Sequence, residues 1–158
     1  MKDQIDAKDQ MILEILQEDS RISVKEIGER IGLSFTPTYE RIKNLENNNV
    51  IKKYVALVDR LKIGIELVAY CNITLKEQSR NALLEFEKLV NEIPQVQEVI
   101  SLSGNYDYML KIIAEDIKSY NEFVVNVISN IPNMGLYHSS IVLNEVKKET
   151  AYFIPKQD

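Results

Sequence analysis

The amino-acid sequence predicts an α+β protein of two domains, with helices alone in the first part and strands alternating with helices in the second. One observation behind this prediction is a pair of short amphipathic helix patterns between Ile22 and Lys53, which only a short turn separates in the sequence. Another is an internal repeat with an offset of 38 residues, in which Ile93-Pro94-Gln95-Val96 corresponds to Ile131-Pro132-Asn133-Met134. A chain of 158 residues is long enough for two small domains.

The helices of the first domain have clear start and stop signals. Asp6 followed by Asp9, and Ser23 followed by Glu26, have the spacing of capping boxes, so helices are expected to begin directly after Asp6 and Ser23. Gly32 is a left-handed stop for the second helix. Only one residue separates it from the next candidate N-cap. Two helices joined by so short a turn form a helix-turn-helix, which we assign to residues 1–50.

The third helix is the candidate DNA-reading element and is expected to run from about Phe35 to Asn47. Ile42 and Leu45, with Tyr39 one turn back, are its expected buried stripe. The remaining face is polar and partly basic, as suits a helix in a major groove. The candidate DNA contacts are Ser34, Thr36, Pro37, Thr38, Arg41, Lys43 and Asn44. The alternative is two packed helices of an ordinary helical domain.

Charge is distributed unevenly along the chain. The whole sequence has a net charge of −5, which is unfavourable for binding DNA phosphates. Residues 34–53, however, contain four Lys or Arg against two Glu. The basic charge is therefore local to the candidate DNA face. Because one copy would bind phosphate weakly, we expect several copies to act together in an oligomer.

The second domain is predicted to be ferredoxin-like, with the order βαββαβ. Its expected strands are Leu67–Leu75, Val96–Ser103, Asp107–Ala114 and Leu136–Val146. A further strand, Ile51–Asp59, is expected within a linker of residues 51–65, so the domain itself covers residues 66–158. Two helices cover only one face of such a sheet, yet the first strand has apolar residues on both faces. The open face is therefore expected to meet another subunit.

Composition excludes several classes of protein. A single cysteine, Cys71, excludes an internal disulfide and a cysteine-based zinc site, and we expect it to be a small core residue. The sequence contains no run of about 18 apolar residues and no signal-peptide pattern, so a cytoplasmic protein is expected. One histidine and no glycine-rich phosphate loop make an enzyme, a metal site or a bound cofactor unexpected.

Taken in order, these motifs resemble the Lrp/AsnC family of transcription regulators over nearly the whole chain. The shared motifs are Asp6-x-x-Asp9, Ser20-Arg21, Gly32-Leu33-Ser34, Arg41-Ile42-Lys43-x-Leu45-Glu46, Val50-Ile51, Gly104-Asn105-Tyr106-Asp107-Tyr108 and Glu145-Val146-Lys147. Asn49 departs from the family, which usually has glycine there, but Asn tolerates the same left-handed backbone. Asn47-Asn48 is a neutral pair where many members have a charged residue or Gln.

The resemblance implies a regulator that binds double-stranded DNA, assembles from homodimers into tetramers, octamers or larger rings, and binds an amino acid or related metabolite between dimers. The implied effector residues are Gly104, Asn105, Tyr106, Asp107, Tyr108, Ser139 and Ser140. Their chemistry suits a zwitterion, because Asp107 can accept from an ammonium while hydroxyls and backbone N–H groups can bind a carboxylate. The alternative is a tight turn in which Asp107 bonds only its own backbone.

Two further hypotheses stay open from the sequence. His138 lies beside the candidate effector site and could sense pH. The chain could also be a metabolite sensor that regulates an enzyme, using the helical domain to bind that enzyme. The polar outer face of the third helix, with no apolar patch for a partner, argues against this second hypothesis.

Overall fold

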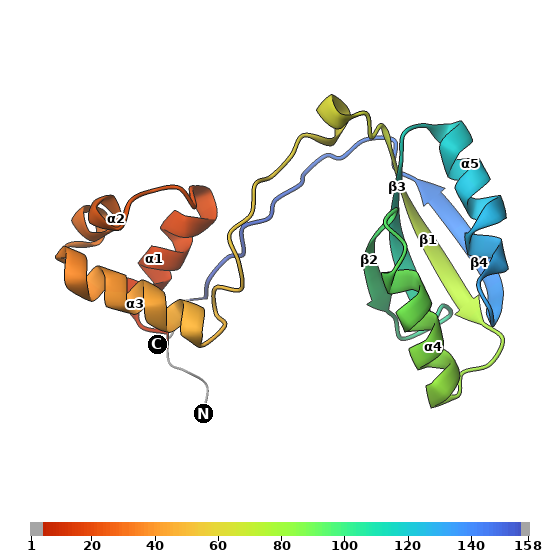
Figure 1. Ribbon diagram of the computed structural model, residues 1–158, viewed down its shortest axis with the longest axis horizontal. Coiled ribbons are helices and arrows are strands. Elements are labelled where there is room, and N and C mark those ends of the chain that lie inside the picture. The colour runs from red at the N-terminus through yellow and green to blue at the C-terminus, as the bar shows by residue number, and fades with distance from the viewer. Residues whose placement is uncertain (1–4, 156–158) are drawn as a thin grey trace. The chain divides into compact units, whose positions relative to one another are not determined.

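A computed structural model of the chain describes residues 5–155 (Figure 1). The chain divides into two compact units, Met1–Leu57 with Lys147–Asp158, and Val58–Val146. The last segment therefore groups with the helical unit, which differs from the expected second domain of residues 66–158. Three hydrogen bonds hold it there. Gln17 Nε2 donates to the carbonyl oxygen of Tyr152 (3.1 Å), the Tyr152 N–H donates to Gln17 Oε1 (2.7 Å), and Gln10 Nε2 donates to the carbonyl oxygen of Pro155 (3.3 Å).

The first unit contains α1 (Ala7–Glu18), α2 (Val24–Ile31) and α3 (Phe35–Asn47). Both predicted capping boxes are present, with Asp6 and Ser23 as N-caps, because each side chain accepts from the backbone N–H three residues on. These caps satisfy N–H groups that a helix start leaves unpaired. The three helices enclose one small core, whose buried residues are Ile12, Ile27, Ile31, Ile42 and Leu45.

The turn between α2 and α3 is unusually tight. Gly32 ends α2 with φ of 70°, as predicted, in the left-handed region that favours glycine. Inside α2, a Cβ added to Gly28 would lie 2.7 Å from the carbonyl oxygen of Leu33 and 3.0 Å from Thr38 Oγ1. Glycine at position 28 therefore lets the turn and the start of α3 approach the α2 backbone closely.

The end of α3 follows the prediction, but the linker does not. Asn49 has φ of 57°, so an asparagine terminates the helix in the left-handed conformation. The expected strand Ile51–Asp59 is wrong for the single chain, since residues 51–59 belong to no strand. A strand requires a hydrogen-bonded neighbour, and the sheet of the described chain includes none for this segment.

The second unit has the predicted βαββαβ order. Its strands are β1 (Leu67–Leu75), β2 (Val96–Ser101), β3 (Tyr108–Ala114) and β4 (Met134–Ile141), and its helices are α4 (Arg80–Asn91) and α5 (Ile117–Asn126). Two short 3-10 turns, η1 (Arg60–Ile63) and η2 (Ile128–Asn130), complete it. The four strands form one antiparallel sheet in the order β2-β3-β1-β4. Compared with the prediction, β2 is two residues shorter, and β4 begins and ends earlier.

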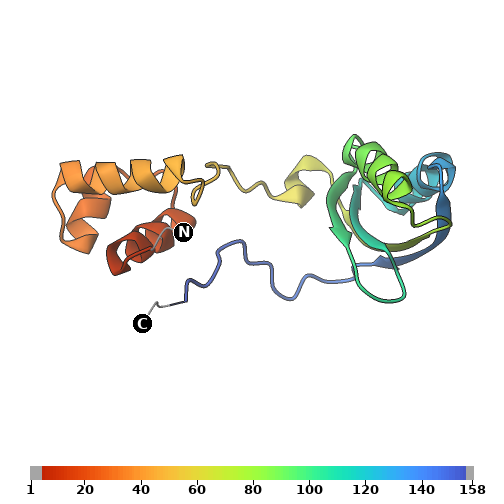
Figure 2. The same cartoon turned by 90° about the horizontal axis from the view of Figure 1, so that it is seen from below.

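Both helices of this unit cover the same face of the sheet (Figure 2). The main core lies between these helices and the sheet, and Cys71 is fully buried in it, as predicted. The other face has no helix on it, and there Leu136 is 77% exposed and Ile100 38% exposed. Among residues 5–155, no helix is both long enough and apolar enough to cross a membrane.

The close approach at Gly28 leads to a stability prediction. Gly28→Ala should lower the free energy of unfolding of the helical unit by roughly 1–2 kcal/mol. A Cβ placed 2.7 Å from a backbone oxygen puts the overpacking cost at about 2–3 kcal/mol, the upper part of its usual range, and this exceeds the gain in helix propensity of ~1 kcal/mol. Thermal denaturation followed by circular dichroism measures this change. Asn49→Gly is the matched control and should leave stability equal or higher, since φ at that position suits glycine. A Gly28→Ala variant as stable as wild type would contradict the packing argument.

Candidate functional site

The outer face of α3 is the first candidate site. The buried stripe of this helix consists of Thr38, Ile42 and Leu45, at positions that share one side of the helix. The opposite side is therefore presented to solvent. Its exposed residues include Thr36, Glu40, Lys43, Asn44 and Asn47. This arrangement allows polar side chains of varied hydrogen-bonding type to meet a ligand together.

Thr38 corrects one sequence expectation. It was expected among the DNA contacts, but its side chain is fully buried and its hydroxyl donates to the carbonyl oxygen of Ser34 (2.9 Å). The close approach of Gly28 buries it, because the hydroxyl lies against the α2 backbone. Ser34 itself is the predicted N-cap of α3, although its side chain makes no capping hydrogen bond.

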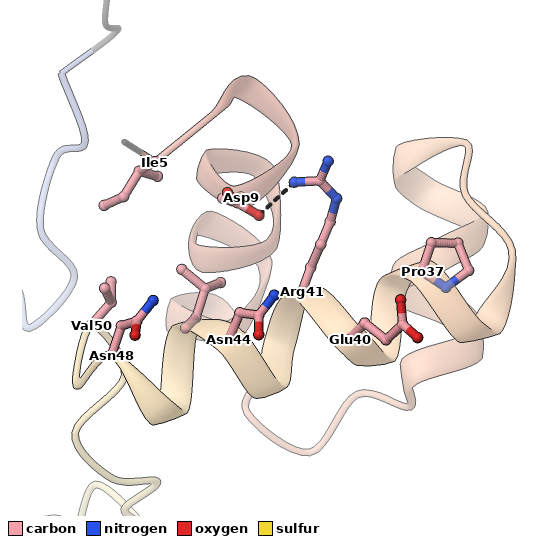
Figure 3. A pocket seen from close by; sticks show the side chains of 9 residues that line it. Ile5, Asp9, Pro37, Glu40, Arg41, Asn44, Asn48 and Val50 are labelled. Carbon is pink, nitrogen blue, oxygen red and sulfur yellow. Dashed lines mark hydrogen bonds and ion pairs between the residues drawn. The ribbon is translucent and has the colours of Figure 1, made fainter. Parts of the chain in front are cut away.

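Arg41, which was also expected among the DNA contacts, forms ion pairs with the start of α1. Figure 3 shows its side chain extending from α3 toward Asp9 of α1. One guanidinium nitrogen, Nη1, donates to Asp9 Oδ1 (2.8 Å) and to Asp6 Oδ2 (2.6 Å). These two carboxylates raise the pKa of Arg41. In turn, the pKa of Asp6 is lowered, mainly by the Asp9 N–H and also by Arg41. Arg41 therefore holds α3 against α1.

Phe35 and Tyr39 are exposed residues of α3 that sequence reasoning did not place in the site. Tyr39 was expected in the buried stripe, but it is 44% exposed, and Phe35 is 58% exposed. Their rings are stacked, with centroids 6.1 Å apart and an angle of 8° between the planes. The expectation that this helix exposes no apolar patch is therefore wrong. Phe35 and Tyr39 are four residues apart, so they share one row of the helix, next to the row of Thr38 and Ile42. This spacing is the sequence signal that could have revealed them.

Lys43 continues this row toward the end of α3. Its ammonium lies 5.8 Å from the centroid of the Tyr39 ring and 2.7 Å from Glu46 Oε2. The bond with Glu46 raises the pKa of Lys43, so this side chain stays cationic at neutral pH. Glu46 also accepts from the Tyr54 hydroxyl (3.0 Å), and burial together with this carboxylate raises the pKa of Tyr54 to about 12.

A cavity of about 390 Å³ opens beside the same helix, between α3 and the start of α1 (Figure 3). It is lined by Ile5, Asp9, Pro37, Glu40, Arg41, Asn44, Leu45, Asn48 and Val50. Its polar wall includes side chains of the outer face of α3. The hollow is therefore continuous with that face.

The loop between β2 and β3 is the second candidate site. The N–H of Leu102 donates to the carbonyl oxygen of Asp107 (2.8 Å), which closes the loop. Gly104 has φ of 131°, a conformation that favours glycine, and nothing lies within 4 Å of a Cβ placed there. Within the described chain, the backbone N–H groups of residues 103–106 donate to no protein acceptor. They are therefore available to an external acceptor.

Asp107 forms hydrogen bonds with groups outside its own turn. The alternative expected from sequence, a tight turn in which Asp107 bonds only its own backbone, is therefore wrong. Its backbone N–H donates to the carbonyl oxygen of Ile73 (2.8 Å). Its carboxylate accepts from the Leu75 N–H at Oδ2 (2.7 Å) and from Gln78 Nε2 at Oδ1 (2.8 Å). An ionised carboxylate has about four acceptor positions, so capacity for a further donor remains. The residue thus joins β3 to the end of β1.

Three expected effector residues do not place their side chains at this loop. Tyr108 has only 3% of its surface exposed, and its hydroxyl donates to Glu87 Oε1 (2.8 Å) beneath α4. Burial raises its pKa to about 12. Ser139 accepts from the Tyr120 hydroxyl (2.6 Å) on the helix-covered face, so Ser140 must lie on the open face. Tyr108 and Ser139 are therefore packing residues of this unit.

Strand register also separates Ser140 from the loop. Ser140 pairs with Tyr70, whereas Tyr108, which follows the loop, pairs with Ile73 three residues further along β1. That offset is about 10 Å along the strand. One chain therefore does not bring Ser140 to Gly104 and Asp107. Within residues 5–155, no three His, Cys, Asp or Glu side chains group as metal ligands.

Comparison with known proteins identifies the family of this chain. Residues 5–52 match the model for a winged helix-turn-helix DNA-binding domain, and residues 68–152 match the model for the Lrp/AsnC ligand binding domain. The chain belongs to the Lrp/AsnC family of transcription regulators. It is a DNA-binding regulator with a separate ligand-binding domain.

Individual Lrp/AsnC relatives match over almost the full length. The transcriptional regulator AzlB of Bacillus subtilis is 39% identical over 91% of this chain and 92% of its own. The leucine-responsive regulatory protein of Rhizobium meliloti is 35% identical over 91% and 92%. An AsnC family transcriptional regulator from Agrobacterium tumefaciens superposes with a TM-score of 0.88 at 33% identity over 95% and 96%. A transcriptional regulator from Neisseria meningitidis, in complex with L-Met, superposes with a TM-score of 0.90 at 29% identity over 94% and 96%.

The ion pairs of Arg41 with Asp6 and Asp9, called the Arg41 clamp below, lead to a pH-dependent prediction. Arg41→Met should lower the free energy of unfolding of the helical unit by roughly 1 kcal/mol at pH 7. Because the folded-state pKa of Asp6 is depressed, the contribution of the clamp is fully present above the ordinary Asp pKa of about 3.9 and is lost as pH falls through the folded value. The difference between wild type and variant should therefore shrink toward pH 3. Hydrogen exchange of the α1 and α3 amides measures it.

The matched control is Lys25→Met, which removes an exposed pair with Glu29 at 3.9 Å. It should change stability little at any pH, because such pairs contribute almost nothing. An Arg41→Met deficit that is the same at pH 7 and pH 3 would show that the guanidinium acts by packing rather than through the two carboxylates.

Proposed function

We propose that this Lrp/AsnC regulator binds double-stranded DNA through the outer face of α3 as a homo-oligomer, and that an amino acid bound at a subunit interface controls that binding. The observation that carries the proposal is the two-sided character of α3. Its inner stripe is locked against α2 by the contact of Thr38 with Gly28, and Arg41 ties its flank to α1. The outer face is left exposed, with polar side chains at Thr36, Glu40, Lys43 and Asn44.

The chemistry of that outer face suits base edges in a major groove. Asn44 offers an amide that can bond adenine at two positions, Glu40 can accept from cytosine, and Thr36 can bond either kind of edge. Lys43 supplies a cation for guanine or phosphate. Of the DNA contacts expected from sequence, we retain Ser34, Thr36, Pro37, Lys43 and Asn44, and we assign Thr38 and Arg41 to holding the helix.

A homo-oligomer is supported by the apolar surface that one chain leaves uncovered. In the second unit, Leu136 on the open sheet face and Leu143 and Val146 beyond β4 are exposed by 77%, 97% and 91%. Patches of this kind mark association surfaces. Two copies related by a two-fold axis would also present two α3 helices to one duplex and double the local positive charge.

An amino acid effector is supported by the family and by the loop of residues 102–107. Relatives include a leucine-responsive protein and a regulator in complex with L-Met. In this chain, the free backbone N–H groups near Gly104 suit a carboxylate, while Asp107 suits an ammonium. The loop lies apart from Ser140 within one chain, so a second subunit would have to complete the site.

DNA binding is tested by a pair of asparagine variants. Asn44→Ala should reduce affinity for a natural operator by about 1–3 kcal/mol, the value of one good base contact. Asn91→Ala, at an exposed position on α4 of the other unit, should leave affinity unchanged. Fluorescence anisotropy measures both constants, and light scattering checks that the variants keep the wild-type oligomer mass. Equal affinity of Asn44→Ala and wild type would remove Asn44 from the interface.

The effector site is tested by two variants, one that removes the charge of Asp107 and one that removes a hydrogen bond to its carboxylate. Thermal-shift screening against the twenty amino acids supplies the ligand. Calorimetry should then show a loss of about tenfold to a hundredfold for Asp107→Asn, since a charge-assisted hydrogen bond contributes roughly 1.5–3 kcal/mol. Gln78→Leu removes one donor to the same carboxylate but keeps its charge, and should retain ligand affinity. Equal losses in both variants would mean that Asp107 only shapes the loop.

A further inference from the structure

Phe35 and Tyr39 form a stacked pair on α3. The DNA contacts proposed above involve neither of them. Both rings are substantially exposed and nearly parallel. The core of the helical unit is completed without them, by residues of α1, α2 and the inner stripe of α3. Leaving about half of each residue's surface in water forgoes the free energy that full burial would provide. Their exposure therefore points to a partner that covers them.

The position of the pair on α3 indicates which partner that is. In helix-turn-helix proteins the N-terminal residues of the second helix approach the base edges. Phe35 is the first residue of α3 and Tyr39 lies one turn later, on the rows next to Thr36 and Glu40. Lys43, one further turn along the same row, places a cation beside the Tyr39 ring. An apolar pair followed by a cation suits a groove edged by phosphates.

We propose that Phe35 and Tyr39 read thymine by contact with its 5-methyl group in the major groove. This inference rests on the proposed DNA binding through α3 and specifies part of the sequence that α3 recognises. The 5-methyl is the apolar group that a base pair presents in the major groove, and phenylalanine is among the side chains that contact it. Each ring of the stacked pair limits the rotamers open to its neighbour, so less rotamer freedom is lost on contact. The recognised element should therefore contain thymine beside the positions read by Thr36 and Glu40.

The test removes the methyl group alone. The full chain is used to select a high-affinity duplex from a random-sequence pool, and each thymine of that duplex is replaced in turn by deoxyuridine, which pairs identically but lacks the methyl. Wild type should lose roughly fourfold in affinity at each contacted thymine, as expected for one buried apolar carbon. At the same positions Phe35→Ala or Tyr39→Ala should bind the thymine and uracil duplexes equally.

Two further variants make the result specific. Phe35→Leu keeps an apolar contact and should restore part of the thymine preference. Phe153→Ala removes a phenylalanine outside α3 that is more exposed than Phe35 (88% against 58%), and it should keep the wild-type response to uracil. Circular dichroism melts confirm that each variant is folded. The measured quantity is a ratio between two duplexes on one variant, so a general loss of stability does not produce it.

The outcomes separate this inference from the function on which it rests. If wild type enriches no sequence from the pool, the proposed DNA binding fails and the thymine contact with it. If wild type binds a selected duplex but is indifferent to uracil, or if both alanine variants retain its uracil response, DNA binding stands and the methyl contact is overturned. A changed oligomer mass in Phe35→Ala with an unchanged uracil response would also overturn it, by assigning the pair to a contact between copies.

Discussion

The close approach of α2 to the start of α3 is the constraint on which the surface proposed to read DNA depends. Without a Cβ at Gly28, the carbonyl oxygen of Leu33 and the hydroxyl of Thr38 pack directly against the α2 backbone. This contact decides which side of α3 faces inward. Arg41 then fixes the flank of α3 through two carboxylates at the start of α1. A helix held from two directions can present its remaining side chains in one geometry, which base reading requires.

The helical unit shows which features a sequence determines locally. Capping boxes at Asp6 and Ser23 and the left-handed stop at Gly32 depend on residues a few positions apart, and all were predictable. The burial of Thr38 in place of Tyr39 was not, because a short helix tolerates two stripe assignments one residue apart and a contact with another helix decides between them. Arg41 and Asp6 are 35 residues apart, so no local pattern reveals their ion pair.

In the second unit, topology was more predictable than the candidate site. The internal repeat and the two Ile-Pro turns indicate the βαββαβ order directly. The expected effector residues came as a group from family resemblance, yet the two-residue period of a strand places Ser139 and Ser140 on opposite faces. Applied to β4, that alternation would have separated them from sequence. The expected linker strand failed for another reason, since pairing for residues 51–59 would have to come from outside the described chain.

Arg60 joins the two chain segments that connect the ligand-binding unit to the DNA-binding unit. The chain passes between the units twice, near residue 58 and near residue 146. Arg60 donates to Glu145 Oε2 (3.2 Å) and to the carbonyl oxygens of Ile65 (2.9 Å) and Glu66 (2.7 Å), so it ties both crossings to one point of the second unit. A ligand shifts a conformational equilibrium only by binding one state better than another. Under the proposed function, an effector that favours one arrangement of the ligand-binding units therefore acts on DNA binding through two tethered connections rather than one.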